Sequence, residues 1–240
     1  MNENEISQSG ILRLFISLTA IVLPIIFLLK GIYGSFIFTF SIPLLWQIGF
    51  LGKPIGSLGL RVNSVKSSII PGVATGCLLG FLGGNLLKFL GITGHVFSNL
   101  HKLQFSVGSF NIVFPLQKEL GYRLLTVSDT LVGTYVYLIF CVFVIGLGEE
   151  LFWRGFIQKK LSNYLSMDVA IWFTAFLFAL IHFYIFIILP FKLGISFLAL
   201  IVVSGAAWGY LFKYFSNLWP AVISHGITAF IIWKYYFFSP

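Results

Sequence analysis

The sequence predicts an all-α membrane protein, a polytopic bundle with about seven or eight transmembrane helices. Composition is the first reason, because 58% of the 240 residues are hydrophobic and only 9% are charged. Soluble domains contain roughly 45–50% apolar residues and need a polar surface. The second reason is that the apolar residues gather in runs near the ~20 residues that cross a bilayer as a helix. We therefore expect residues 1–240 to form a single membrane domain surrounded by the lipid bilayer.

Seven apolar runs have a length close to that of a membrane-crossing helix. Their apolar residues are continuous, whereas the strands of a membrane barrel alternate polar and apolar residues, so helices are predicted. The predicted spans are Ile11–Leu29, Tyr33–Leu51, Ile69–Leu90, Leu131–Leu147, Val169–Leu189, Leu193–Phe212 and Trp219–Phe237. The mixed stretch Ile92–Thr130 is expected to be a loop, an interfacial helix or an eighth, partial membrane element.

The formal net charge of +8 comes from basic residues that stand singly between the apolar runs. Lys and Arg in such places anchor helices at lipid headgroups, and no basic stripe or docking motif indicates nucleic acid as a partner. If all seven runs cross, Lys53, Arg61 and Lys66 lie on the side of the N-terminus together with the basic residues of 154–166. The positive-inside rule then predicts a cytoplasmic N-terminus, and the short loops favour a bacterial plasma membrane.

Glycines recur every four residues in the third run and again in the sixth. This spacing puts them on one stripe of a helix, where the backbone of another helix can approach closely. The two stripes are Gly72, Gly76, Gly80 and Gly84, and Gly205 and Gly209. They predict packing faces, used either within the chain or in a helix-mediated oligomer.

Two adjacent carboxylates, Glu149 and Glu150, follow the fourth run directly. Ionisable residues at membrane depth cost at least ~2.5 kcal/mol by insertion scales and mark functional sites. If this segment is helical, Glu150 and Arg154 are four residues apart in the favourable order for an ion pair, and Glu149 points about 100° away. Glu149 can then face the bundle interior as a general base. A charge cluster at a helix end, without catalysis, is the alternative.

His182 and His225 lie inside the fifth and seventh apolar runs. Either one alone fits a hydrogen-bonded core histidine, but with the carboxylate pair they place ionisable groups on three different helices. Two histidines and one glutamate form a known catalytic zinc set, so zinc bound by Glu149, His182 and His225 is one option. The other is a metal-free site in which Glu149 and His182 activate water while His225 stabilises an oxyanion.

These motifs resemble the CPBP family of intramembrane proteases, which includes type II CAAX prenyl endopeptidases and bacterial proteins linked to bacteriocin processing and self-immunity. The family pattern is EExxxR, then FxxxH, then HxxxN or HxxxD, each on its own membrane helix. The matching segments here are Glu149-Glu150-Leu151-Phe152-Trp153-Arg154, Phe178-Ala179-Leu180-Ile181-His182, and the segment that begins at His225. The resemblance covers residues 131–236, which we expect to be the catalytic core.

The resemblance implies an intramembrane endopeptidase that cleaves membrane-associated peptides or proteins, either CAAX-type substrates or leader and pheromone peptides. It implies catalytic roles for Glu149, His182 and His225, supporting roles for Glu150, Arg154 and Phe178, and either a metal or a glutamate mechanism. One residue departs from the family pattern. Ala229 stands where the family has Asn or Asp, and alanine has no side-chain donor or ligand atom. This departure predicts a slow protease, a protease that uses a substitute group, or a non-catalytic member.

Two other functions stay open at the level of sequence. A non-catalytic bacteriocin self-immunity or scaffold protein would bind a partner through the glycine stripes, and Ala229 supports it. An ion-coupled or proton-coupled transporter would also place Glu and His inside a helix bundle, although the repeated halves common in transporters are not visible here. The sequence contains no HExxH motif, serine nucleophile elbow, Walker loop or GxGxxG motif, so the usual soluble hydrolases and nucleotide-binding proteins are not indicated.

Overall fold

A computed structural model describes residues 45, 49, 52–92, 102–107, 110–115, 130–183 and 185–237. The first predicted span and, apart from Leu45 and Gly49, the second lie outside the described residues. The described part of the chain is helical except for one β-hairpin, so the predicted helical class is confirmed there with that exception.

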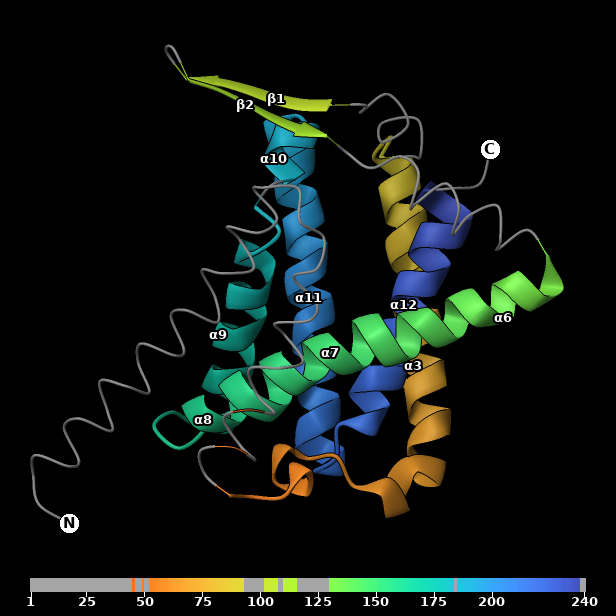
Figure 1. Cartoon of the computed structure of the whole chain (residues 1–240), viewed down its shortest axis with the longest axis vertical. Coiled ribbons are helices and arrows are strands. Elements are labelled where there is room, and N and C mark those ends of the chain that lie inside the picture. Colours follow the sequence, from red (N-terminus) through yellow and green to blue (C-terminus); the bar gives the residue numbers. More distant parts are fainter. Residues whose placement is uncertain are drawn as a thin grey trace, which may run out of the picture.

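Fifteen short and long elements make up the described chain, and their labels follow Figure 1. The η labels mark 3-10 helices (η2 and η3) and π-helical segments (η4, η5 and η6). The elements are η2 (Ile55–Leu58), η3 (Val62–Ser64), α3 (Val65–Phe89), β1 (Lys102–Val107), β2 (Phe110–Pro115), α6 (Leu131–Phe140), η4 (Cys141–Gly146), α7 (Leu147–Glu150), η5 (Leu151–Gln158), α8 (Lys159–Leu161), α9 (Met167–Leu180), α10 (Ile185–Ile188), α11 (Phe191–Phe215), α12 (Trp219–Ile232) and η6 (Trp233–Phe237).

Three helices within the described residues are long and apolar enough to cross a membrane: Val62–Phe89, Leu131–Leu161 and Phe191–Phe215. Helix α9 is apolar but shorter. The chain is therefore an integral membrane protein, as predicted. The described residues support three of the seven or eight predicted spans by helix length and composition.

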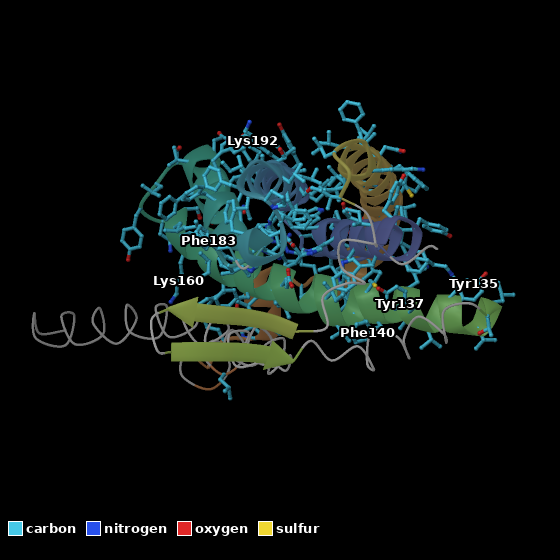
Figure 2. The ribbon with its side chains drawn as sticks, turned by 90° about the horizontal axis from the view of Figure 1, so that it is seen from above. Tyr135, Tyr137, Phe140, Lys160, Phe183 and Lys192 are labelled. Atoms are coloured by element: carbon cyan, nitrogen blue, oxygen red, sulfur yellow. The ribbon has the colours of Figure 1, made fainter. Side chains whose placement is uncertain are left out.

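Residues 131–161 form one continuous helix, here called the long helix, which comprises α6, η4, α7, η5 and α8. It crosses in front of α3, α11 and α12 in Figure 1, and Figure 2 shows Tyr135, Tyr137 and Phe140 along one half of it and Lys160 at the other end. The prediction that this span ends at Leu147 was wrong. The helix continues through two π-helical segments, so the carboxylates lie inside it, between wide turns of the kind that is frequent at functional sites.

The predicted span Val169–Leu189 is not a single helix, which corrects the expected position of His182. Helix α9 ends at Leu180, and the backbone N–H of His182 donates to the carbonyl of Ala179 (2.9 Å), three residues back. The carbonyl of Phe178, which a continued α-helix would pair with that N–H, lies 2.9 Å from Nδ1 of the His182 ring instead. A side chain that competes for a backbone acceptor in this way favours the end of a helix. His182 thus lies in the turn after α9.

The hairpin of β1 and β2 lies within the stretch 92–130, for which the sequence predicted a loop, an interfacial helix or a partial membrane element. The strands pair antiparallel, with Lys102 opposite Pro115 and Val107 opposite Phe110. A hairpin is none of the expected elements. Its signal was present, because apolar and polar residues alternate strictly from Lys102 to Val107, a period of two that is typical of a strand.

The glycine stripe of α3 packs against α12, and the predicted packing face is thereby confirmed within the chain. A Cβ atom at Gly76 would lie 2.8 Å from both the carbonyl oxygen of Ser224 and the Cβ of Ile227. Gly72 and Gly80 meet neighbouring α12 side chains at similarly short distances. The backbones of the two helices can approach this closely because no side chain separates them.

The variant Gly76→Ala is expected to destabilise the protein by about 1–3 kcal/mol, the usual cost of adding atoms to a packed contact. Gly83→Ala is the matched control on the same helix, because a Cβ there would lie 3.4 Å from the Leu200 side chain, an ordinary contact. Thermal unfolding of the purified protein in detergent measures both. Equal midpoints for the two variants would contradict a tight contact between α3 and α12.

Candidate active site

The long helix meets α12 at two glycines, one on each helix. A Cβ at Gly146 would lie 2.5 Å from the carbonyl oxygen of Val222, and a Cβ at Gly226 would collide with the backbone of Val142. Neither position has room for a side chain. Gly146 precedes the two carboxylates and Gly226 follows His225 directly, so the contact brings the first and third motifs of the sequence together.

A chain of charged groups runs through this contact. Arg154 Nη1 donates to Glu150 Oε1 at 2.8 Å, and Nδ1 of His225 lies 2.8 Å from the same oxygen. Glu150 and Arg154 are both 0% exposed. The ion pair expected between residues four apart is therefore confirmed, and Glu150 also binds the imidazole of the third motif.

The guanidinium of Arg154 has further partners that hold it in place. Nη2 donates to the carbonyl oxygen of Gly205 on α11 at 2.6 Å. The group also lies over two aromatic rings, 5.2 Å from the centroid of Phe178 and 5.4 Å from that of Trp208. Cation–π contacts strengthen when the cation is desolvated. A buried charge is tolerated only where hydrogen bonds and opposite charges replace water, and Arg154 has both.

A second contact to α11 follows one turn further along the long helix. Gln158 Nε2 donates to the carbonyl oxygen of Gly209 at 3.3 Å, and a Cβ at Gly209 would lie 2.8 Å from Gln158 Oε1. The predicted packing face of Gly205 and Gly209 is confirmed. It also has a function that the pattern did not indicate, because both glycine carbonyls accept hydrogen bonds from polar side chains of the long helix.

Glu149 and Glu150 meet opposite edges of the His225 ring. Glu149 Oε2 lies 3.6 Å from Nε2, while Glu150 Oε1 lies at Nδ1. Glu149 is 9% exposed and His225 is 6% exposed, so both are buried. The imidazole of His225 and the guanidinium of Arg154 are thus the groups that pair with these buried carboxylates.

Both histidines use Nδ1 for a fixed hydrogen bond. A carbonyl or carboxylate oxygen can only accept, so Nδ1 of His182 donates to Phe178 and Nδ1 of His225 donates to Glu150. The bond made by one ring nitrogen sets the state of the other. In His225, Nε2 is therefore the ring atom that meets Glu149.

Aromatic rings surround the histidines. Phe178 contacts His182 and His225 edge-on, with ring centroids 5.0 Å and 5.8 Å apart. Trp208 stacks on His225 at 3.8 Å with an interplanar angle of 10°, and its Nε1 donates to Ser224 Oγ at 3.1 Å. Phe178 was predicted as a supporting residue. Trp208 and Ser224 were not, and no sequence motif indicates a stack between residues of two separate helices.

The predicted zinc set requires Glu149, His182 and His225 to lie together. Each histidine donates from Nδ1 to an oxygen acceptor, which is also how zinc-binding histidines are oriented. Within the described residues, however, no group of three or more His, Cys, Asp or Glu side chains lies close enough together to bind a metal ion. Glu149 and His225 are neighbours, and His182 does not complete a zinc-binding set with them.

Ala229 lies one turn after His225 on α12 and is half-buried. The neighbouring Thr228 does not replace the missing polar group, because its Oγ1 donates to the carbonyl oxygen of Gly76 on α3 at 3.3 Å. On a helix, adjacent residues point about 100° apart, so Thr228 faces α3 rather than the histidine.

The comparison with known families matches one segment of the chain. The family model described as type II CAAX prenyl endopeptidase Rce1-like matches residues 131–231. The match begins where the long helix begins and ends in α12, so it includes all three motifs, and the predicted resemblance is confirmed over this segment. No curated protein and no solved structure matches the chain.

The variant Arg154→Met is expected to destabilise the protein by about 3–5 kcal/mol, because it removes the buried ion pair of Glu150 and leaves the carboxylate with the His225 imidazole alone. Lys213→Gln is the control, since it breaks the partly exposed ion pair with Asp168 (2.7 Å), and pairs in contact with water contribute little. Thermal unfolding in detergent compares the two. A large fall in the unfolding midpoint of Lys213→Gln, or an unchanged midpoint in Arg154→Met, would show that the buried pair is not what stabilises the site.

Proposed function

We propose that this protein is an intramembrane endopeptidase that cleaves membrane-associated peptides or proteins, of the CAAX type or of the leader and pheromone type. The observation that carries the proposal is the pair of buried carboxylates at opposite edges of one imidazole, in the segment that matches the Rce1-like family. Buried ionisable groups are costly in a membrane and are retained where they have a function.

The partners of the two carboxylates support separate roles. Glu150 binds Arg154 and His225 through Oε1 and is fully buried, which suits a group that orients the site. Glu149 Oε2 is 3.6 Å from His225 Nε2, slightly beyond hydrogen-bond length. Polar groups at such a distance are often joined by water, and one water molecule can contact both atoms at normal length. Glu149 is therefore the general base of the proposal, and this water is the nucleophile.

The reaction follows from these positions. Glu149 takes a proton from the water as the water oxygen bonds to the scissile carbonyl carbon. The negative charge that develops on the carbonyl oxygen is stabilised by N–H donation from His225. His182 donates from Nδ1 to Phe178, so its Nε2 can assist Glu149 by accepting a hydrogen bond from the attacking water. The proton on Glu149 then passes to the amide nitrogen, the C–N bond breaks, and a carboxylic acid and an amine leave the site.

One observation favours a second candidate, a non-catalytic membrane protein of the bacteriocin self-immunity or scaffold class. Ala229 supplies no donor where the family pattern has Asn or Asp. The glycine stripes, through which such a protein was expected to bind a partner, are occupied by helices of the same chain. This occupation weakens the second candidate and leaves Ala229 as its support.

Glu149→Gln is expected to reduce cleavage by about 10²–10⁴-fold, because it removes the base and keeps the size of the side chain. Glu150→Gln is the matched variant, and we expect a smaller loss of about 10–100-fold, as for other groups that orient a site histidine. Mass spectrometry of a membrane-peptide library incubated with each purified protein measures the rates, with and without a zinc chelator.

The outcomes of that experiment separate the candidates. Equal losses in the two variants would refute the division of roles between the carboxylates. Loss of wild-type cleavage with the chelator would assign the water activation to a metal. No cleavage by the wild type under any condition would favour the non-catalytic candidate.

Ala229→Asn is expected to raise kcat, by up to about 10²-fold, because a single oxyanion donor contributes that much in other hydrolases. The neighbouring variant Thr228→Ser keeps the hydroxyl that contacts α3 and is expected to leave kcat unchanged. Cleavage of the best library peptide by the three proteins gives the comparison. An unchanged rate in Ala229→Asn would show that the position has no part in the reaction.

A further inference from the structure

The segment 52–64 closes one end of the helix bundle, at the bottom of Figure 1. The carbonyl oxygen of Gly59 accepts a hydrogen bond from the backbone N–H of Leu218 at 3.0 Å, at the start of α12. Leu58 is buried, and its carbonyl lies against Gly155 of the long helix, where a Cβ would be 2.7 Å from the oxygen. The segment is therefore docked on two helices.

Hydrogen bonds with polar side chains also hold the segment 52–64 at two points, Ser57 and Arg61. Lys159 Nζ donates to the carbonyl oxygen of Ser57 at 2.5 Å. The buried Asn217 accepts from the backbone N–H of Arg61 at 3.4 Å and donates to Ser68 Oγ at 2.9 Å. Arg61 and Lys159, which are far apart in the sequence, are thus held at one end of the molecule.

Three exposed cations result from this docking, and we call Lys53, Arg61 and Lys159 the cation cluster. Arg61 and Lys53 lie close enough to Lys159 for their charges to repel its charge. The sequence has no acidic residue in 52–67 or 159–166. In the described structure none of the three cations forms an ion pair, and Asp168, the first acidic residue after Lys159 in the sequence, is bound by Lys213 at 2.7 Å.

Exposed cations at the opposite end of the bundle provide a contrast. Lys88 ends α3 and Lys192 begins α11, and each of these helices has 25 residues. Helices of that length measure about 37 Å, so these two lysines lie a full helix length from the cation cluster. Figure 1 shows both of these helix ends at the top, away from the segment 52–64.

We propose that the cation cluster binds the phosphate of an anionic lipid headgroup in the adjacent leaflet. The repulsion of Lys159 by Arg61 and Lys53 is relieved by an anion, and an integral membrane protein meets headgroup phosphates at the ends of its helices. A fixed cluster holds such a phosphate more tightly than single flexible lysines do, because its backbone is already ordered. The inference does not depend on the proposed proteolysis.

The test uses the full chain in nanodiscs of phosphatidylcholine with or without phosphatidylglycerol. Native mass spectrometry counts retained lipids, and titration with phosphatidylglycerol gives the apparent affinity. The double variant Lys53→Gln with Arg61→Gln is compared with Lys88→Gln with Lys192→Gln, which removes the same charge elsewhere. We expect a loss of roughly 30-fold in phosphatidylglycerol affinity for the first variant and little change for the second, with the wild-type affinity falling at high salt.

Three results would overturn the inference. Equal losses in the two double variants would show a diffuse charge effect, and unchanged affinity in both would show no site. Retention of phosphatidylcholine as strong as that of phosphatidylglycerol would show that the anionic headgroup is not recognised. Circular dichroism confirms folding, and the single variant Lys53→Gln, at an exposed residue of the segment, carries the same test if the double variant does not fold.

Discussion

The negative charge of Glu150, fully buried in an apolar bundle, is the constraint on which the rest of the site depends. A carboxylate without partners at this depth would oppose folding, so partners must come from the surrounding helices. Arg154 comes from the same helix, one turn away, and His225 comes from α12. Arg154 in turn binds the backbone of α11 through Gly205. One charge thus fixes three helices relative to one another, and the orientation of the imidazole follows from it.

Close packing makes these short hydrogen bonds possible. The contacts at Gly146 and Gly226 let the long helix and α12 approach until backbone meets backbone, and α3 supports α12 from its other side through Gly76. Residues without side chains therefore determine where the polar side chains meet. Chemistry and packing are linked here, because a wider spacing between helices would put the carboxylates out of reach of His225.

Some of this arrangement follows from the sequence and some does not. The pair of Glu150 and Arg154 was predictable because both residues lie on one helix, where spacing alone gives the geometry. The turn at His182 was not, since it depends on the imidazole taking a carbonyl that the helix would have used. The stack of Trp208 on His225 joins two helices whose register no local pattern encodes. The alternation of polar and apolar residues in 102–107 could have predicted a strand. It was missed because it lies in a stretch of mixed composition between membrane spans.

The hydrogen bonds of Arg154 and Gln158 to α11 end on main-chain oxygens, those of Gly205 and Gly209. Every amino acid has a backbone carbonyl oxygen, so these hydrogen bonds do not require any particular side chain on α11. What the contact restricts is volume, because a side chain at either glycine would fill the space that the long helix occupies. At these two positions α11 therefore needs only residues without a side chain, while the polar side chains of the contact all come from the long helix.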